Sequence, residues 1–466
     1  MQKFTHSRSS QQKTTPVTKK STVNRLRWLW LLLGLTGVAT LSATAGALLA
    51  VSLSSTPLLQ SQLSPEDAEV FGQGEEIATG RTFRLPELTR PVNILMLGIK
   101  VLSSDVRDPA PELADLGYHA LVNSFEGLSD TMLLLRFNPR SKQLVVLSIP
   151  RDTRTWVEGA GVTKINSANY YGGPALSAKA ISELLGDVAI DRYIRINVQG
   201  VEKLIDALGG VTVNVPQDMK YSDDSQHLYI NLKAGKQRLN GDQAMQFLRF
   251  RYDENGDVGR VQRQQMLMRA VLEQTLNPAT MARLPKILSL IQSHIDTNLS
   301  VEELLALVGF AAQTKRSNAQ MLLLPGDFSE PGEYDLSYWL PSHRRIDELM
   351  DQYFGFGAGR YRDWVEPADL SVAIQDSTGD EAAIDTFLNT LYDGGYNRTY
   401  VGKSWNEVLP ETRIVAQNGD LDSAQAIRRH LGFGEVRVES TGSLSSDITI
   451  QIGRDWLSQM GPAKAQ

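Results

Sequence analysis

The chain has 466 residues, of which 42% are hydrophobic and 21% charged, and it contains no cysteine. This composition is ordinary for globular domains, and the length suggests two or three of them. The lack of cysteine excludes disulfides, a thiolate nucleophile and cysteine-based zinc or iron–sulfur sites, and it fits a protein exported into an oxidising compartment.

The formal net charge of −6 is distributed unevenly. Residues 1–27 carry seven basic side chains and no acidic one, so the rest of the chain sums to −13. A globular part of this charge repels a polyanion such as DNA, and we expect no nucleic-acid partner. An anionic ligand must therefore be bound by a local basic cluster.

An uncharged apolar segment, Trp28 to Leu53, follows the basic tail. As a helix, about 26 residues reach about 39 Å, which is enough to cross a bilayer. The basic flank predicts a cytoplasmic N-terminus, a single-pass anchor in the cell membrane and an extracytoplasmic globular part. A cleaved signal peptide is the alternative, because Ala43-Thr44-Ala45 resembles a cleavage site. The long apolar run favours the uncleaved transmembrane helix.

Residues 54–91 are rich in Ser, Gln, Pro and Glu and predict a stalk. Three apolar runs then predict buried strands, at Val92–Ile99, Thr131–Phe137 and Gln143–Ile149. Turn-forming residues 138–142 separate the last two, so we expect a hairpin that delivers Pro150-Arg151-Asp152 to a sheet edge.

Helices and strands are expected to alternate farther along the chain. Helical spacing marks residues 174–185, 201–208, 240–248 and 259–276, and strands are predicted at 193–198 and 211–215. This alternation predicts an α/β sandwich around a central mixed sheet. Residues 279–356 have a mostly helical pattern and complete a domain at 92–356.

A glycine-rich linker at 357–367 precedes a second, smaller α/β unit at 368–456, and residues 457–466 form a tail. Strands of the second unit are predicted at 371–375, 413–416, 435–439 and 447–452, with helices at 382–394 and 423–432.

Several short motifs share one order and content with a known family. They are Asn93-Ile94-Leu95-Met96-Leu97-Gly98, Ser129-Asp130-Thr131, Ser148-Ile149-Pro150-Arg151-Asp152, Lys164-Ile165-Asn166, Phe247-Leu248-Arg249-Phe250-Arg251-Tyr252 and Gly256-Asp257-Val258-Gly259-Arg260-Val261-Gln262-Arg263-Gln264-Gln265. Together they resemble the LytR-CpsA-Psr (LCP) family of envelope glycopolymer transferases over residues 92–276. The second unit resembles the LytR-type C-terminal domain often attached to that family, and we expect this unit to be dispensable for phosphate binding.

The resemblance implies a phosphotransferase. Its donor would be a polyprenyl-pyrophosphate-linked glycan beside the membrane, and its acceptor a peptidoglycan hydroxyl, with a phosphodiester link as the product. Two alternatives stay open: hydrolysis of the lipid pyrophosphate, and a non-catalytic envelope-binding or regulatory role. The chain has no P-loop, no G-x-S-x-G elbow and no H-E-x-x-H motif that would indicate another chemistry.

Four arginines are the leading candidates for gripping the phosphates: Arg249, Arg251, Arg260 and Arg263. The guanidinium fork binds phosphate oxygens in pairs and keeps its charge, which suits a pyrophosphate. Arg260 and Arg263 lie three residues apart and hence on one helix face. Charge alone favours a solvated basic helix face paired with the neighbouring acids Asp253, Glu254 and Asp257, and the family resemblance reverses this preference towards the phosphate site.

Arg151 follows a proline at the end of a predicted strand, and the resemblance gives it a phosphate contact. An ion pair with Asp152 is the structural alternative; Asp152 is also a candidate general base and substrate contact. By the same resemblance, Gln264 lies near the phosphates.

The resemblance assigns Asp130 to a Mg²⁺ ion that contacts the pyrophosphate, which agrees with the preference of magnesium for one or two carboxylates plus phosphate oxygens. A strand cap is the alternative role of Asp130. Two departures weaken the metal prediction: Lys100 stands where the family has an aspartate, and Leu128 where it has an arginine. Lys100 could meet a phosphate instead, and Asp105 could replace the missing carboxylate.

Overall fold

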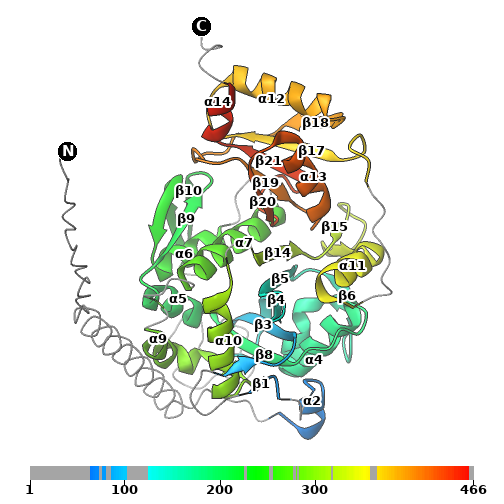
Figure 1. Ribbon diagram of the computed structural model, residues 1–466. Helices are drawn as coiled ribbons and strands as arrows, with labels where there is room; N and C mark the ends of the chain where they lie inside the picture. Colours follow the sequence, from blue (N-terminus) through cyan, green and yellow to red (C-terminus); the bar gives the residue numbers. More distant parts are fainter. Residues whose placement is uncertain are drawn as a thin grey trace, which may run out of the picture. The chain divides into compact units, whose positions relative to one another are not determined.

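The computed structural model describes the chain in ten stretches, 63–72, 76–79, 86–101, 124–224, 228–250, 256–275, 280, 283–315, 318–356 and 365–460 (Figure 1). The predicted cytoplasmic tail and the predicted transmembrane helix lie outside these stretches. Within them, none of the helices combines the length and the apolar character that a membrane span requires.

A mixed six-stranded sheet forms the centre of the larger domain. Its order is β13-β8-β3-β4-β5-β14, and its strands are β3 (Val92–Lys100), β4 (Leu128–Asn138), β5 (Gln143–Ile149), β8 (Arg192–Asn197), β13 (Ile295–Thr297) and β14 (Ala319–Leu323). The pairs β3–β4, β4–β5 and β13–β8 are antiparallel, whereas β3–β8 and β5–β14 are parallel. The expected central mixed sheet and the expected hairpin are therefore confirmed.

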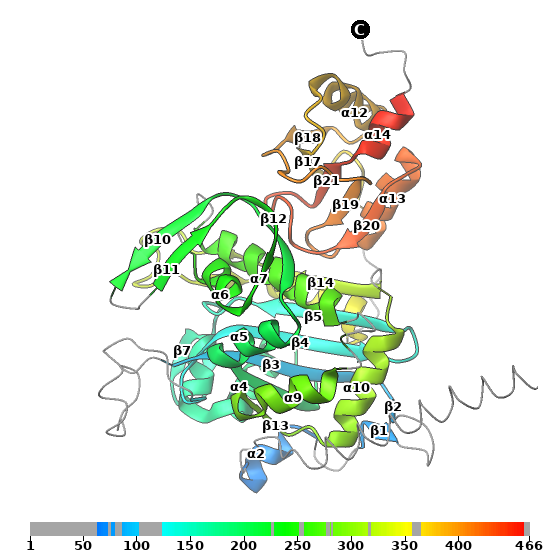
Figure 2. The same ribbon diagram turned by 90° about the vertical axis from the view of Figure 1, so that its left-hand side faces the viewer.

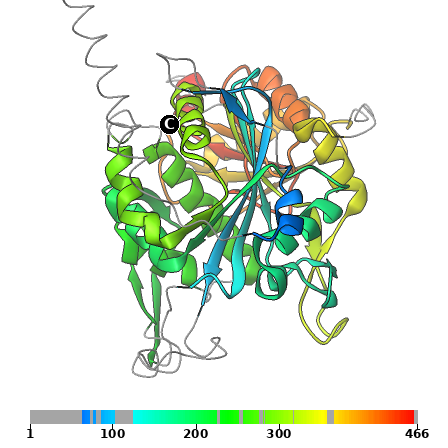
Figure 3. The same cartoon turned by 90° about the horizontal axis from the view of Figure 1, so that it is seen from below.

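The strands of this sheet are apolar on both faces because each face is covered by helices. Leu95, Leu97 and Leu134 face one core together with α4 (Ala168–Leu184) and α11 (His343–Leu349). The alternate residues Ile94 and Leu133 face a second core with α10 (Val301–Gln313). Figure 3 shows the sheet between these two helical layers.

A third core lies among α6 (Gly241–Arg249), α7 (Gly256–Thr275) and two antiparallel pairs. The pairs are β9 (Val211–Val215) with β12 (Gly235–Leu239), and β10 (Met219–Asp223) with β11 (Leu228–Leu232), which project as ribbons in Figure 2. The strand expected at 211–215 and the helix after Asn240 are confirmed. Asn240 is the N-cap of α6 in a reciprocal capping box with Gln243.

The other elements of the larger domain are short. They are α2 (Pro65–Glu69), β1 (Ala78–Thr79), β2 (Glu87–Leu88), β6 (Arg154–Val157), β7 (Gly161–Lys164), η2 (Ile165–Ser167), α5 (Val198–Ala207), α9 (Leu284–Ile291), η4 (Gln292–His294), β15 (Gly326–Phe328), β16 (Trp339–Pro341) and the π-helical turn η6 (Met350–Phe354).

Two expectations about this domain need correction. The segment 54–91 is not only a stalk, because α2 and the β1–β2 pair fall within it and Phe71 and Ile77 are fully buried. The segment 279–356 is mostly helical, as expected, but it also contributes β14, which pairs in parallel with β5. That pairing makes β5 an inner strand, so Arg151 and Asp152 follow a strand end and do not lie along the outer edge of the sheet.

The C-terminal domain, residues 365–460, is built on a second sheet of order β18-β17-β21-β19-β20. Its elements are β17 (Ser371–Asp376), α12 (Glu381–Asp393), β18 (Arg398–Val401), β19 (Arg413–Ala416), α13 (Leu421–Leu431), β20 (Glu435–Val438), β21 (Ile448–Ile452) and α14 (Arg454–Met460). The four expected strands and two expected helices are present, and β18 and α14 are additional. All described residues of both sheets belong to one compact unit.

Candidate active site

A β-bulge in β4 places Asp130 at the centre of the site. In the pairing of β3 with β4, Gly98 lies opposite Thr131 and Ile99 lies opposite Ser129, so the register skips Asp130. Bulges of this kind bend a strand and turn the side chain of the extra residue, often next to active sites. Gly98 permits the close approach, since a Cβ there would lie 3.0 Å from the Cβ of Thr131.

Arg151 and Asp152 leave the adjacent strand β5 in a tight turn. The carbonyl of Pro150 accepts hydrogen bonds from the backbone N–H of Thr153 at 3.0 Å and from its hydroxyl at 2.7 Å. This turn directs Arg151 towards β4, where its Nη1 lies 2.6 Å from Oδ1 of Asp130. The Nε of Arg151 lies 3.4 Å from Oδ2 of Asp152, so one guanidinium bridges two carboxylates.

The carboxylates of Asp130 and Asp152 stabilise the positive charge of Arg151. Burial lowers the pKa of the guanidinium, but the carboxylates of Asp130 and Asp152 outweigh that effect and leave the pKa above its ordinary value. The side chains of Arg151 and Asp130 are nevertheless 24% and 33% exposed, so a ligand can reach both.

Lys164 is a further site residue, for which the sequence alone predicted no role. It ends β7, opposite Arg154 in the β6–β7 hairpin, and its Nζ lies 2.7 Å from Oδ1 of Asp152. The signal available in the sequence was the Lys164-Ile165-Asn166 motif, which the family resemblance includes. Asp152 thus lies between Arg151 and Lys164.

Helix α7 contributes Arg260 and Gln264 from a third direction. Nη1 of Arg260 lies 4.0 Å from Oδ2 of Asp152, and its side chain is 14% exposed. The amide of Gln264, one helical turn farther along, donates to the backbone carbonyl of Asp130 at 3.3 Å. Both predicted residues are therefore brought to the Asp130–Arg151–Asp152 cluster.

Arg263 behaves differently from its predicted role as a substrate contact. It is only 2% exposed, its Nη2 donates to the backbone carbonyl of Phe250, and its guanidinium lies 5.7 Å from the centre of the Phe250 ring. These contacts hold the residue after Arg249 against α7, which indicates a positioning role for Arg263. Arg249 is the last residue of α6, and Arg251 lies outside the described residues.

Lys100 ends β3 opposite Leu128, two residues before Asp130 on the neighbouring strand. It therefore lies at the same end of the sheet as the arginine cluster. Asp105, the proposed substitute for the missing carboxylate, lies outside the described residues. The part of the chain that the structure describes contains no group of three or more acidic or histidine side chains able to hold a metal ion.

The arrangement is suited to binding an anion with several oxygens. Arg151, Lys164 and Arg260 surround the two carboxylates of Asp130 and Asp152, which leaves a surplus of positive charge at the ends of β4, β5 and β7. Two guanidinium groups offer paired donors, which match phosphate oxygens. The structure therefore defines a mixed α/β protein with a basic, partly exposed site of the kind that binds phosphate groups.

Comparison with known families identifies this protein further. The chain belongs to the LytR-CpsA-Psr family, because the model of the LytR_cpsA_psr family matches residues 63–354. A second model, described as the LytR cell envelope-related transcriptional attenuator, matches residues 369–456 and so covers the C-terminal domain.

Among curated relatives, two polyisoprenyl-teichoic acid–peptidoglycan teichoic acid transferases are similar to this chain. The one from Oceanobacillus iheyensis is 35% identical and the one from Bacillus cereus is 30% identical. The alignments cover 57% and 56% of this chain, and 75% and 77% of the relatives. Among solved structures, TagV of B. subtilis is 24% identical with a TM-score of 0.47 and covers 58% of this chain and 99% of its own.

Proposed function

We propose that this protein transfers a glycopolymer from a polyprenyl-pyrophosphate carrier to peptidoglycan and forms a phosphodiester link during cell-envelope assembly. The observation that carries the proposal is the cluster of Arg151, Lys164 and Arg260 around Asp130 and Asp152. The relatives named as polyisoprenyl-teichoic acid–peptidoglycan teichoic acid transferases support the same reaction class.

In the proposed reaction, an acceptor hydroxyl oxygen attacks the phosphorus that carries the glycan. A new P–O bond forms while the P–O bond of the diphosphate bridge breaks, and polyprenyl phosphate leaves with the bonding electrons. The hydroxyl proton passes to a base, for which Asp130 and Asp152 are the candidates. Charge develops on the phosphoryl oxygens, and fixed guanidinium groups stabilise it without reorganising.

The existing ion pairs suggest how the donor would enter the site. Arg151 already binds two carboxylates, and both partners remain partly accessible to solvent. A diphosphate could replace one carboxylate in the guanidinium fork, because both present paired anionic oxygens. The released carboxylate would then accept a proton or bind a cation.

Mg²⁺ is part of the proposal, although Lys100 stands in place of one expected ligand. Magnesium is commonly held by one or two carboxylates together with phosphate oxygens, so a site with few acidic ligands fits it. Asp130 would hold the ion, which would neutralise diphosphate charge when bound. Asp105 remains a proposed second ligand.

We also propose that the apolar segment 28–53 anchors the protein in the cell membrane, with the N-terminus in the cytoplasm. The seven basic residues before the segment support this orientation. The site would then face the lipid-linked donor on the outer side of the membrane.

The proposal is tested by incubating the full-length protein in detergent with a lipid-diphosphate-linked glycan, with and without a peptidoglycan acceptor. We expect joined product, and we expect the Arg151→Ala/Arg260→Ala double variant to lose it, because both guanidinium groups belong to the cluster. Arg344→Ala is the matched control, since Arg344 is 79% exposed and pairs only locally with Glu348. Joined product from the double variant would exclude the proposed site, whereas phosphorylated glycan released without any joined product would identify a hydrolase.

A further inference from the structure

One loop of the C-terminal domain contacts three residues along α7, the helix that brings Arg260 and Gln264 to the site. The loop is Glu439–Gly442, which follows β20, and we call it the clasp. Its three partners on α7 are Gln262, Gln265 and Arg269. Because these lie three and four residues apart, they form one stripe on the helix.

The contacts are specific and polar. The side-chain amide of Gln262 donates to the carbonyl of Gly442 at 2.6 Å. The backbone N–H of Ser440 donates to Oε1 of Gln265 at 2.8 Å. Arg269 forms an ion pair with Glu439, and these two side chains are only 11% and 3% exposed.

The ion pair stays charged in the folded protein. Burial raises the pKa of Glu439, but Arg269 and Arg437 outweigh it and leave the pKa below its ordinary value. Arg437 lies 3.8 Å from Glu439 and is itself paired with Glu435 at 2.6 Å. Glu439 is therefore a buried anion shared by two arginines, one on α7 and one on β20.

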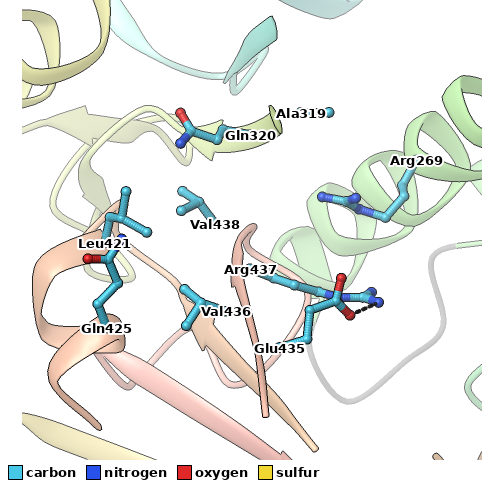
Figure 4. A pocket seen from close by; sticks show the side chains of 9 residues that line it. All are labelled: Arg269, Ala319, Gln320, Leu421, Gln425, Glu435, Val436, Arg437 and Val438. Atoms are coloured by element: carbon cyan, nitrogen blue, oxygen red, sulfur yellow. Dashed lines mark hydrogen bonds and ion pairs between the residues drawn. The ribbon is translucent and has the colours of Figure 1, made fainter. Parts of the chain in front are cut away.

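Close apolar packing does not account for this contact. A cavity of about 200 Å³ lies beside the ion pairs, and both polar side chains (Arg269, Gln320, Gln425, Glu435 and Arg437) and apolar ones (Ala319, Leu421, Val436 and Val438) line it (Figure 4). A gap of this size forfeits dispersion contacts between the surfaces that line it. On the side that faces the clasp, α7 is therefore held by its hydrogen bonds and by the ion pair with Glu439, whereas Leu267 and Ala270 pack in the third core.

Neighbouring residues on α7 connect the clasp to the site. Gln264 donates to the carbonyl of Asp130, whereas Gln265, the next residue, accepts from Ser440 of the clasp. A helix moves nearly as a rigid rod with a rise of about 1.5 Å per residue, so a displacement at Gln265 is carried to Arg260. A misplacement of a catalytic group by about 1 Å can lower the rate about a hundredfold.

We propose that the clasp is a positioning element for the phosphate-binding helix, with Glu439 as its central residue. This inference rests on the proposed function, and it replaces the expectation that the C-terminal domain is dispensable for phosphate binding. Glu439 does not touch the reacting groups; it acts through Arg269 and α7 on Arg260 and Gln264.

The test compares full-length Glu439→Gln with wild type, using a polyprenyl diphosphate that carries one N-acetylglucosamine as donor. We expect the KM for this donor to rise about tenfold or more, because Arg260 is displaced while the site residues remain. Loss of folded protein alone would lower the apparent kcat and leave KM unchanged. Amide hydrogen exchange should quicken in α7 while remaining slow in β3.

Glu407→Gln is the matched control. Glu407 also connects the C-terminal domain to the larger domain, through a 2.6 Å ion pair with Lys236, but Lys236 lies in β12 and is 61% exposed. We expect the KM of the Glu407→Gln variant for the donor to stay within about twofold of wild type, since exposed ion pairs contribute little to stability.

Gln262→Ala keeps the proposal testable if Glu439→Gln does not fold. It removes one hydrogen bond of the clasp and leaves the buried charges paired, and we expect a smaller rise in KM, about threefold, as the loss of one hydrogen bond allows. An unchanged KM in Glu439→Gln, or in Gln262→Ala where that is the only folded variant, overturns the inference. Wild type that neither binds nor transfers the donor overturns the proposed function instead.

Discussion

Two clusters of arginine–carboxylate pairs contact the same helix, α7, but they differ in exposure. In the candidate active site, the Arg151 and Asp130 side chains are 24% and 33% exposed. At the clasp, those of Arg269 and Glu439 are 11% and 3% exposed. A partly hydrated pair can exchange one partner for a phosphate at low cost, whereas a buried pair that loses one partner leaves an uncompensated charge.

This difference in exposure indicates different roles: the exposed pair is suited to binding a ligand, and the buried pair is suited to positioning α7. The accessible cluster presents cations to a ligand, and the inaccessible cluster fixes the helix from which one of those cations comes. Variants in the first cluster should therefore change activity much more than stability. Variants in the second should change stability and activity together.

The largest effect is expected for Arg151→Ala. Loss of a charged donor that stabilises the transition state typically costs about 3–4 kcal/mol, so kcat/KM should fall by about a hundredfold to a thousandfold. The Arg151→Lys variant should recover only part of the lost kcat/KM, because an ammonium group lacks the paired donors of a guanidinium. Transfer assays on both variants measure this. A stable Arg151→Ala protein that retains wild-type kcat/KM would remove Arg151 from the site.

Glu439→Gln should have the next largest effect, on stability. Removing one partner of a buried pair costs about 3 kcal/mol or more, measured by denaturant unfolding at neutral pH. The pKa of Glu439 is lowered from an ordinary value of 4.5, so its stabilisation is complete above that pH and is lost as pH falls through the lower, folded value. The stability gap between variant and wild type should therefore narrow in acid; a gap that is constant down to acid-induced unfolding would contradict the ion-pair assignment.

A smaller effect is expected for Asp130→Asn. We expect activity to fall about tenfold, as for loss of one metal ligand or one charged hydrogen-bond partner. A chelator should inhibit wild type and leave the residual activity of the variant unchanged. Wild-type activity that is insensitive to chelation would exclude the metal role of Asp130 while leaving the arginine role intact.

Asn240→Ala should have the smallest effect. Loss of this N-cap costs about 1 kcal/mol in unfolding free energy, and α6 ends at Arg249, so transfer should also weaken slightly. Ser300→Ala is the matched variant, because Ser300 forms the same capping box with Glu303 at the start of α10, which carries no candidate site residue. Equal losses of activity in both variants would show that α6 has no special link to the site.

The features that the sequence predicted well depend on local patterns. The β4–β5 hairpin follows from two apolar runs around turn-forming residues, and the start of α6 follows from Asn240 before an amphipathic segment. The segment Ala319–Leu323 was missed as a strand because its identity depends on parallel pairing with β5, far away in the sequence.

In the candidate site, too, some residues were predictable from local sequence patterns and others were not. Arg151, Asp152 and Arg260 were identified by residue type and motif, and the structure brings them together. Burial of Arg263 was not predictable, because an arginine on a helix usually faces solvent and its contact with Phe250, 13 residues earlier, is not part of a local pattern. The ion pair of Glu439 with Arg269 depends on how the C-terminal domain meets α7, which no local pattern encodes.

The bulge in β4 gives the site an unusual tolerance to change. The direction of the Asp130 side chain is set by the number of residues between two paired positions, Ser129 and Thr131, and not by the chemical nature of any of them. Amino-acid replacements nearby can alter packing, but they cannot return the strand to regular alternation. Removal of one residue would do so, because the residues on either side would then pair in regular register with Gly98 and Ile99 and no extra residue would be left between them. The number of residues in β4 thus determines where the carboxylate of Asp130 lies.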